Sequence, residues 1–244
     1  MTMASEYDQI TAFHYSAFRP SLHLPILKEC LEEGVQHSFG LDVGCGTGQS
    51  SIALTHFCKK VMGIEPSREM LEKSIQHPRI TYSYYNGQDF NFSDDCFDLI
   101  GFAGSLYYGK SQQLLDEVIR VGKNNSRTII YDFELSLDTI LKRLNLEPSL
   151  EQDSHYDHEV NFNGLNQEHI KLEKEFKGNL QLEISISNIS HLLLSSKDNY
   201  NLLLESFGKD DLYQTVLKEL RSRMNSENIV IGAKTYSTVY RIKK

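Results

Sequence analysis

Leu41-Asp-Val-Gly-Cys-Gly-Thr-Gly48 is the stretch that decides the fold of this 244-residue chain. It continues a short apolar run at Phe39–Val43 and precedes a helical pattern at Gln49–Phe57. Glycines between a strand and a helix let the backbone turn sharply and approach a ligand without interference from side chains. The first turn of the following helix adds exposed N–H groups and the positive end of a dipole. The stretch therefore predicts a nucleotide-like ligand site at the carboxyl end of a strand.

Strand and helix patterns alternate after this stretch. Alternation of short apolar runs with helices of about ten residues is typical of a parallel sheet wrapped by helices, and right-handed crossovers then give a doubly wound α/β layer. The predicted strands are Val61–Ile64, Ile80–Tyr84, Phe97–Phe102 and Arg127–Phe133, and the predicted helices between them are Ser67–Gln76 and Gln112–Gly122.

The ends of the chain have other patterns. Residues 6–36 have a helical pattern that breaks at Pro20, and two alternating runs flank Lys177-Gly178-Asn179, which is typical of a hairpin. Helices are predicted at about 197–206 and 210–224, and strand at Ile229–Ile242. We expect one domain over 1–244. Its core would be about 36–134 plus 196–244, with a cap inserted at about 135–195 and the helical segment 1–35 over the site.

Composition limits the function classes. The formal net charge is −8 and no long Lys/Arg run occurs, which argues against nucleic-acid binding. No apolar stretch has membrane-spanning length, and the N-terminus lacks the pattern of a secretory signal, so we expect a cytoplasmic protein. Four widely spaced cysteines predict neither a disulfide framework nor a zinc site. A small-molecule partner is favoured, and both monomer and homodimer remain open.

Two residues of the glycine stretch argue against a dinucleotide. Asp42 precedes the first glycine, where a carboxylate would repel a pyrophosphate but suits a cationic group such as an amino group. Gln49 stands where the dinucleotide pattern needs Gly or Ala for close helix packing. Glu65 follows at the end of the next strand, and its carboxylate can accept hydrogen bonds from both hydroxyls of a ribose. Glu65 alone indicates a ribose, because NAD-binding folds use an acid at the same place.

The order Leu41-Asp-Val-Gly-Cys-Gly-Thr-Gly, then Gly63-Ile-Glu-Pro-Ser, then Phe92-Ser-Asp-Asp-Cys-Phe-Asp-Leu-Ile resembles the class I S-adenosylmethionine-dependent methyltransferases. The resemblance covers about 38–133. The stretch Tyr15-Ser-Ala-Phe-Arg19-Pro-Ser also resembles the branch that includes trans-aconitate methyltransferase. The resemblance implies a seven-stranded, mostly parallel Rossmann-like sheet with an inserted cap between the fifth and sixth strands.

The resemblance also implies S-adenosylmethionine as cofactor, and it implies that separate segments of the chain bind its methionyl, ribose and adenine moieties. The glycine loop would line the methionyl part, Glu65 would hold the ribose, and Pro66 and Ser67 would lie beside the adenine. Asn86-Gly87-Gln88 would meet the adenine edge, with Asp89 as a competing assignment, and Arg19 would bind the cofactor carboxylate in two parallel hydrogen bonds. The full predicted set is Tyr15, Arg19, Asp42, Gly44, Cys45, Gly46, Gly48, Glu65, Pro66, Ser67, Asn86, Gly87, Gln88, Ala103, Gly104 and Ser105.

No catalytic residue is assigned. Methyl transfer from a sulfonium is an in-line displacement that depends largely on alignment, and a base is needed only where the acceptor carries a proton. Aromatic side chains suit a cationic donor. A metal pair at His155 and His158 has no third ligand in view, so no metal is predicted. The catalytic candidates are Tyr7, His14, Tyr107 and Tyr108, and the remaining pocket candidates are Phe18, Leu106, Asp132, Phe133 and Glu134.

Three functions remain in competition. The sequence favours an S-adenosylmethionine-dependent methyltransferase that acts on a small molecule. The alternative is a non-catalytic S-adenosylmethionine-binding module, or a subunit of a methyltransferase complex. A nicotinamide-dependent oxidoreductase is disfavoured by Asp42 and Gln49.

Overall fold

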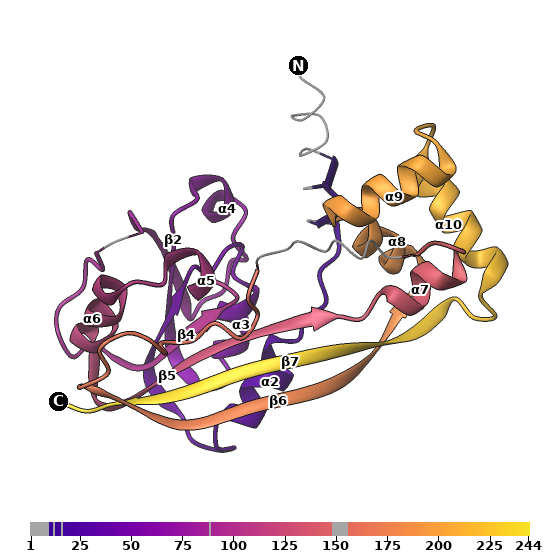
Figure 1. Cartoon of the computed structure of the whole chain (residues 1–244). Coiled ribbons are helices and arrows are strands. Elements are labelled where there is room, and N and C mark those ends of the chain that lie inside the picture. The colour runs from indigo at the N-terminus through magenta and orange to yellow at the C-terminus, as the bar shows by residue number, and fades with distance from the viewer. Residues whose placement is uncertain (1–9, 12, 16, 88, 148–155) are drawn as a thin grey trace. The chain divides into compact units, whose positions relative to one another are not determined.

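The computed structural model describes residues 10–11, 13–15, 17–87, 89–147 and 156–244 (Figure 1). They fall into two compact units. We call residues 21–134, 156–178 and 235–244 the sheet unit, and the described residues of 1–20, 135–155 and 179–234 the helical unit. No helix in these described ranges is both long enough and apolar enough to cross a membrane.

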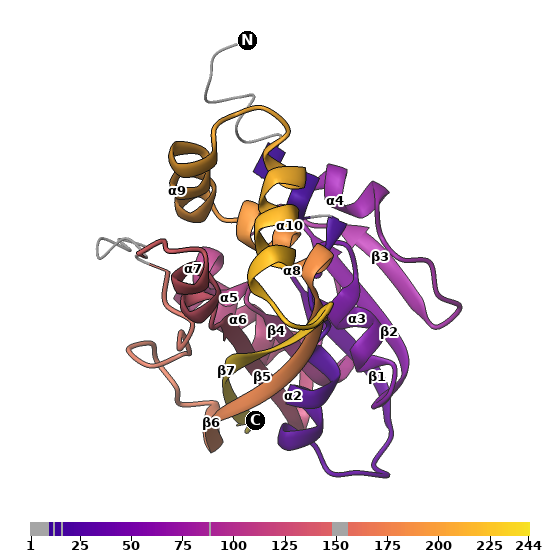
Figure 2. The same cartoon turned by 90° about the vertical axis from the view of Figure 1, so that its right-hand side faces the viewer.

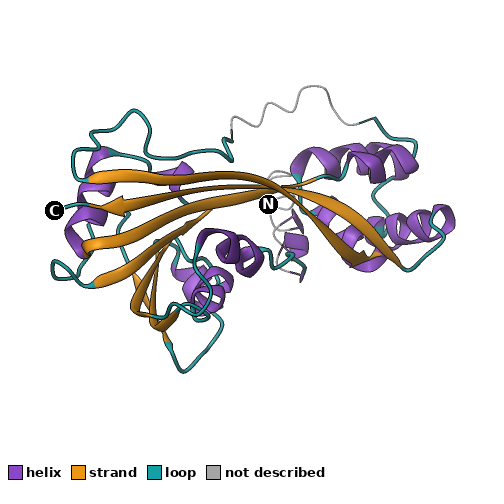
Figure 3. Ribbon diagram, turned by 90° about the horizontal axis from the view of Figure 1, so that it is seen from below, coloured by secondary structure: helices purple, strands orange, loops and turns teal. Residues whose placement is uncertain are grey.

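A twisted sheet organises the chain (Figure 3). It has seven strands in the order β3-β2-β1-β4-β5-β7-β6. The register shows that β1 pairs in parallel with both β2 and β4, that β2 pairs in parallel with β3, and that β4 pairs in parallel with β5. This order confirms the predicted α/β, mostly parallel, Rossmann-like sheet. The strands are β1 His37–Val43, β2 Cys58–Glu65, β3 Ile80–Tyr84, β4 Phe97–Ala103, β5 Gly122–Leu135, β6 Ile170–Ser185 and β7 Asn228–Ile242.

Helices cover both faces of the sheet unit. Leu54 of α3 (Gln49–Leu54) lies over Gly101 of β4, where an added Cβ would be 3.4 Å from the leucine side chain. The next residue, Phe102, belongs to the apolar cluster that contains Leu115 of α6 (Gln112–Val121). Successive strand residues point to opposite faces, so α3 and α6 lie on opposite faces, as a doubly wound sheet requires. The other helices of this unit are α2 His23–Cys30, α4 Arg68–Glu72 and α5 Leu106–Gly109.

The helical unit has its own apolar core. Four helices surround it: α7 Asp138–Arg143, α8 Ile186–Leu194, α9 Lys197–Phe207 and α10 Leu212–Arg223 (Figure 2). Helices α9 and α10 confirm the predicted helices near 197–206 and 210–224. Helix α8 was not predicted, because its beginning alternates apolar and polar residues as a strand does. Ser185 caps it by accepting a hydrogen bond from the Asn188 N–H at 3.3 Å.

The hairpin predicted at 177–179 is wrong, because β6 runs through these residues as one strand. Gly178 lies against Thr235 of the neighbouring strand β7, where an added Cβ would be 2.7 Å from the threonine Oγ1. The glycine therefore permits the close approach of strands β6 and β7 and makes no turn. The strand predicted at Arg127 also begins earlier, at Gly122, directly after α6.

Candidate functional site

The parallel strands β1, β2 and β4 end at the same edge of the sheet. Val43 is opposite Ile64 on one side and Phe102 on the other, and Ala103 is opposite Tyr131 of β5, which continues to Leu135. The residues that follow β1, β2 and β4 therefore lie next to one another and beside the last residues of β5. This edge brings together the predicted segments 44–48, 65–67 and 103–105, at the place where open α/β sheets bind ligands.

The glycine loop needs its glycines for backbone conformation and for space. Gly44, Gly46 and Gly48 have φ angles of +70°, +55° and +91°, in the left-handed region. A Cβ at Gly44 would lie 2.5 Å from the Cβ of Ser105, and one at Gly48 would lie 2.1 Å from the Tyr82 hydroxyl oxygen. The loop therefore packs against the segment after β4, where Ser105 Oγ donates a hydrogen bond to the Val43 carbonyl.

Asp42 is fully buried beneath the loop. Its Oδ2 accepts hydrogen bonds from the hydroxyls of Ser50 (2.7 Å) and Ser51 (2.5 Å), both in the first turn of α3. Its Oδ1 is buried and has no hydrogen-bond partner in the described part of the chain. Burial raises the pKa of this carboxyl to about 6, against the opposing effect of the two serine hydrogen bonds. Asp42 thus fixes the start of α3 and has one oxygen available for a further donor.

Glu65 is held by backbone N–H groups at the end of β2. Its Oε2 accepts from the Gly46 N–H at 3.0 Å, and its Oε1 accepts from the Ser67 N–H at 2.9 Å. A carboxylate has about four lone-pair positions, so positions for further hydrogen bonds remain. Ser67 caps α4 by accepting from the Met70 N–H at 3.3 Å, and Pro66 beside it is exposed. The predicted ribose residue is therefore fixed in place by the predicted methionyl loop.

Cys45 fills space under the loop. Burial raises the pKa of its thiol well above the ordinary value, so it is a protonated, unreactive side chain. All four cysteines of the chain are free thiols.

The predicted adenine-edge segment follows β3. Asn86 Oδ1 accepts from the Asp89 N–H at 3.0 Å, and Gly87 has a φ of +84° with open space around it. Asp89 accepts a hydrogen bond from Gln113 of α6 at 3.0 Å. Gln88 lies outside the described residues.

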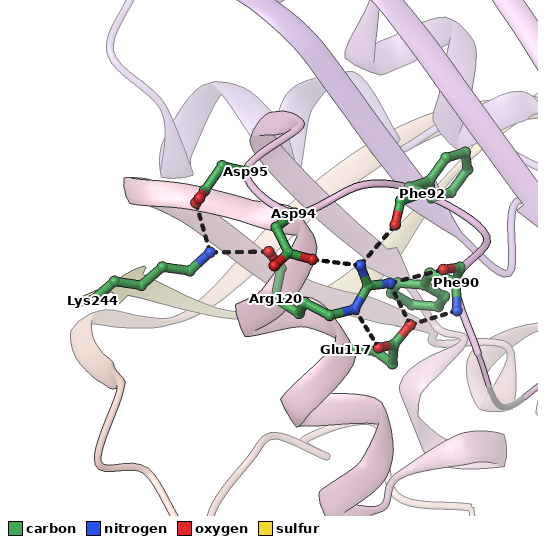
Figure 4. Close-up of polar contacts among 7 residues, drawn as sticks. All are labelled: Phe90, Phe92, Asp94, Asp95, Glu117, Arg120 and Lys244. Atoms are coloured by element: carbon green, nitrogen blue, oxygen red, sulfur yellow. Dashed lines mark hydrogen bonds and ion pairs between the residues drawn. The ribbon is translucent and has the colours of Figure 1, made fainter.

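Arg120 of α6 anchors the rest of this segment (Figure 4). Its guanidinium donates to the carbonyl oxygens of Phe90 and Phe92 at 2.8 and 2.7 Å, and it forms ion pairs with Glu117 and Asp94. The Arg120 hydrogen bond holds the pKa of Glu117 below its ordinary value, and Glu117 in turn accepts from the Phe90 N–H. One side chain therefore fixes the backbone between β3 and β4.

Tyrosines and a histidine gather around Asp132, which lies near the end of β5 and beside the segment that follows β4. The Tyr156 hydroxyl lies 2.8 Å from Asp132 Oδ2 and 2.8 Å from the Gly104 carbonyl oxygen. His158 Nδ1 lies 2.8 Å from the same Oδ2. The Tyr107 ring contacts the Tyr156 ring at 4.5 Å between centroids. Sequence reasoning did not single out Tyr156, because it lies in a polar segment whose place in the fold only tertiary structure reveals.

The other pocket candidates of the sheet unit have separate places. Tyr108 is 79% exposed and touches the Tyr107 ring edge-on, whereas Leu106 and Phe133 are buried. Glu134 accepts a hydrogen bond from the Tyr236 hydroxyl at 3.3 Å. His158 is half-buried beside Asp132, and His155 lies outside the described residues. No group of three metal-ligating side chains occurs within the described ranges.

The N-terminal candidates belong to the helical unit. The Arg19 guanidinium lies 4.5 Å from the centre of the Tyr15 ring, and His14 shares a 2.8 Å hydrogen bond with His191. Phe18 packs against the core of that unit. Tyr7 lies outside the described residues. These contacts are within the helical unit, so the proposed contact of Tyr15 and Arg19 with the cofactor stays a prediction.

Comparison with known proteins identifies the domain. Residues 41–130 match the family described as "Methyltransferase domain". This stretch of the chain is therefore similar to methyltransferase domains. The cofactor that such a domain implies is S-adenosylmethionine.

Two relatives and one solved structure show how far the likeness extends. A "Putative methyltransferase" of Dictyostelium discoideum is 26% identical over 50% of this chain and 46% of its own length. A "Probable S-adenosylmethionine-dependent methyltransferase" of Saccharomyces cerevisiae is 29% identical over 43% of this chain and 39% of its own length. The chain therefore spans less than half the length of these curated relatives. A "Putative Type II Methyltransferase" from Anaeromyxobacter dehalogenans has the same fold, with a TM-score of 0.64 and 16% identity over 93% of this chain and 98% of that one.

Proposed function

We propose that this protein is an S-adenosylmethionine-dependent methyltransferase that acts on a small-molecule acceptor by in-line displacement. The observation that carries the proposal is the hydrogen bond between Glu65 and the Gly46 N–H, which joins the acid after β2 to the glycine loop after β1. A ribose-binding acid and a loop able to hold a methionyl group are thereby fixed relative to each other.

The residues at this edge fit S-adenosylmethionine. Asp42 Oδ1 is a buried acceptor without a donor in the described part of the chain, and a carboxylate favours the positively charged amino group of the methionyl moiety. Gly44 cannot carry a side chain, so the loop presents bare backbone. Glu65 retains lone pairs for two ribose hydroxyls. Among the other residues of the predicted set, Pro66 and Ser67 would lie beside the adenine.

Catalysis would depend on alignment more than on acid–base chemistry. S-adenosylmethionine supplies a methyl group that is already activated by the sulfonium charge. The protein's part is to fix the position of that group and of the acceptor, which can account for much of the rate enhancement. Gly104 and Ser105 would border the reacting centre, because they follow β4 beside the glycine loop.

Several finer properties are part of the proposal. The chain would form one domain over 1–244, with a core of about 36–134 plus 196–244, a cap inserted at about 135–195 and an N-terminal helical segment 1–35. The Tyr15–Arg19 stretch favours the branch that includes trans-aconitate methyltransferase. We propose a cytoplasmic monomer or homodimer that binds no nucleic acid, consistent with the net charge of −8.

A transfer assay tests the proposal. The full chain is incubated with S-adenosylmethionine labelled in the methyl group and a metabolite extract, and small-molecule products are separated. We expect a labelled product that is absent with Glu65→Ala and present with Glu69→Ala, since Glu69 is an exposed acid on the neighbouring helix. Donor binding without any labelled product would favour a non-catalytic S-adenosylmethionine-binding module or a subunit of a complex.

A further inference from the structure

We propose that His158, oriented by Asp132, is the general base of the reaction, and that the acceptor is a phenolic hydroxyl held by the rings of Tyr107, Tyr108 and Tyr156. This inference rests on the proposed methyltransferase function and deepens it. It names the acceptor class and one catalytic residue.

The His158–Asp132 contact orients the imidazole ring. His158 Nδ1 lies 2.8 Å from Asp132 Oδ2, and the two side chains are 31% and 15% exposed. A carboxylate only accepts hydrogen bonds, so Nδ1 must carry the proton, and Nε2 of the neutral ring carries the lone pair. A carboxylate that fixes the tautomer and stabilises the imidazolium is the arrangement that makes histidine an effective base.

The His158–Asp132 pair lies beside the segment that follows β4. Asp132 follows Tyr131, which is opposite Ala103 of β4, and its Oδ1 lies 3.2 Å from the position of a Cβ on Gly104. Gly104 precedes Ser105, which packs against Gly44 of the glycine loop. All of these residues belong to the sheet unit. The base is therefore at the same sheet edge as the proposed donor loop.

An aromatic surface lies around the base. The Tyr156 ring lies 4.5 Å from the Tyr107 ring, 5.9 Å from the Tyr108 ring and 4.7 Å from the His158 ring, measured between centroids. Tyr108 is largely exposed. Aromatic rings at such distances interact more favourably than the burial of their apolar area alone would give. A planar aromatic acceptor suits this surface.

Whether methyl transfer needs a base depends on the protons that the acceptor carries. A carboxylate acceptor is already ionised, and a neutral amine keeps its protons after it is methylated, so neither needs a base in the transfer step. A hydroxyl must lose its proton. The acceptor O–H proton passes to His158 Nε2 while the O–CH₃ bond forms and the S–CH₃ bond breaks, and the products are an aryl methyl ether, S-adenosylhomocysteine and an imidazolium paired with Asp132.

The groups that surround His158 are compatible with the positive charge of its protonated imidazole. Asp132 from β5 contacts it directly, and Tyr156 on its own segment contacts Asp132. Tyr236 from β7 stacks against His158 at 6.0 Å and donates to Glu134. The Asp132 carboxylate, 2.8 Å from the ring nitrogen, favours the protonated imidazole after transfer.

The experiment compares four acceptors and three variants of the full chain. Phenol, catechol, benzoate and benzylamine are each incubated with S-adenosylmethionine, and methylated products are quantified by mass spectrometry between about pH 5.5 and 9.5, a range that brackets the ordinary histidine pKa. We expect the wild type to methylate phenol or catechol and to lose rate as pH falls, because a protonated His158 cannot take the proton of the acceptor hydroxyl. His158→Asn should lose about 100-fold in kcat near pH 7 and lose that acid limb. Asp132→Asn should lower the rate and move the acid limb to lower pH, which a merely structural role would not do.

His56→Asn is the matched control, since His56 is exposed beyond α3, at the opposite edge of the sheet from the carboxyl ends of the strands. Calorimetric titration of every variant with S-adenosylmethionine distinguishes loss of donor binding from loss of methyl transfer. Absence of donor binding by the wild type would contradict the proposed function itself. Donor binding without methylation of phenol or catechol, or an unchanged kcat and pH profile in His158→Asn, would overturn this inference alone.

Discussion

Glu65 Oε2 accepts a hydrogen bond from the Gly46 N–H at 3.0 Å, so the acid after β2 is joined directly to the glycine loop after β1. The same carboxylate accepts from the Ser67 N–H at the start of α4. Two loops that belong to different strands are thereby held by one buried side chain. A ligand that uses Glu65 for its ribose will find the glycine loop already positioned.

Replacing Glu65 should weaken donor binding. Glu65→Gln keeps the size of the side chain but removes its charge and one acceptor oxygen, so the ribose and the Gly46 N–H would compete for what remains. Hydrogen bonds to a charged group contribute about 1.5–3 kcal/mol each, so the dissociation constant for S-adenosylmethionine should rise by roughly 10- to 100-fold. Glu69→Gln, on the exposed face of α4, should leave it unchanged when both are titrated by calorimetry. Equal donor affinities of the two variants would show that Glu65 does not contact S-adenosylmethionine.

Gly44 should tolerate no side chain. Gly44→Ala places a Cβ 2.5 Å from the Cβ of Ser105 in a backbone conformation that already disfavours alanine, whereas Gly164→Ala has the same backbone strain in open space. Gly164→Ala should cost about 1–2 kcal/mol of stability and leave donor affinity intact. Gly44→Ala should cost more and reduce donor affinity at least tenfold. Similar donor affinities in two folded variants would show that the contact with Ser105 has no part in binding.

Arg120→Ala should destabilise the sheet unit. The change removes hydrogen bonds to two carbonyl oxygens and leaves Glu117 without its cation, for a loss of about 2 kcal/mol and a fall of roughly 5 °C in Tm. Lys73→Ala, which removes the exposed ion pair with Glu69, should change Tm by less than about 1 °C. Thermal unfolding measured by circular dichroism decides this, and a Tm for Arg120→Ala as high as that of Lys73→Ala would contradict the anchoring role.

Donor affinity should depend on the ionisation of Asp42. Burial raises the pKa of Asp42 to about 6 in the folded protein, so the carboxyl is ionised above that pH and becomes neutral as pH falls below it. Because the ionised form attracts the donor's amino group, affinity for S-adenosylmethionine should be greatest above pH 6 and should fall as pH decreases through that value. The pH dependence should disappear in Asp42→Asn, measured by calorimetry across this range. A wild-type affinity that rises on acidification would be incompatible with this contact.

The stability of the helical unit should fall in mild acid. Burial, and secondarily the charge of His191, lower the pKa of His14 to about 4. The unfolded chain takes up this proton near the ordinary histidine pKa of about 6.5, whereas the folded chain does not, so stability is complete above pH 6.5 and is lost as pH falls toward 4. Urea unfolding at neutral and at mildly acidic pH measures how much stability each protein loses on acidification. This loss should be smaller in His14→Gln than in the wild type, and it should be unchanged in His56→Gln. Parallel losses in all three proteins would assign the acid sensitivity to other groups.

The succession of strands and helices along the chain from β1 to β5 could be predicted from local patterns. Asp42, Glu65 and the glycines of the loop are recognisable because strand, turn and helix signals flank them in the sequence, and register then places their loops at one edge. Helix α8 and strand β6 could not be predicted correctly, because the helix begins with a strand-like alternation and Gly178 has the composition of a turn. Only the approach of Thr235 shows why a glycine is needed there.

The acceptor side of the candidate site was largely inaccessible to sequence reasoning. Asp132, Tyr107 and His158 were noticed separately, and nothing in their spacing indicates that Tyr156 joins them, because the segment that carries it returns to the sheet from a distant part of the chain. Tyr236 was missed for the same reason, since it comes from β7. Tertiary contacts, and not local propensity, assemble this part of the site.

Calorimetric titration of the wild-type chain with S-adenosylmethionine and, separately, with NAD shows which cofactor the glycine loop and Glu65 bind. We expect saturable binding of S-adenosylmethionine at one site per chain, with a dissociation constant in the micromolar range, about −8 kcal/mol, and no measurable binding of NAD. Micromolar binding of NAD without binding of S-adenosylmethionine would contradict this expectation.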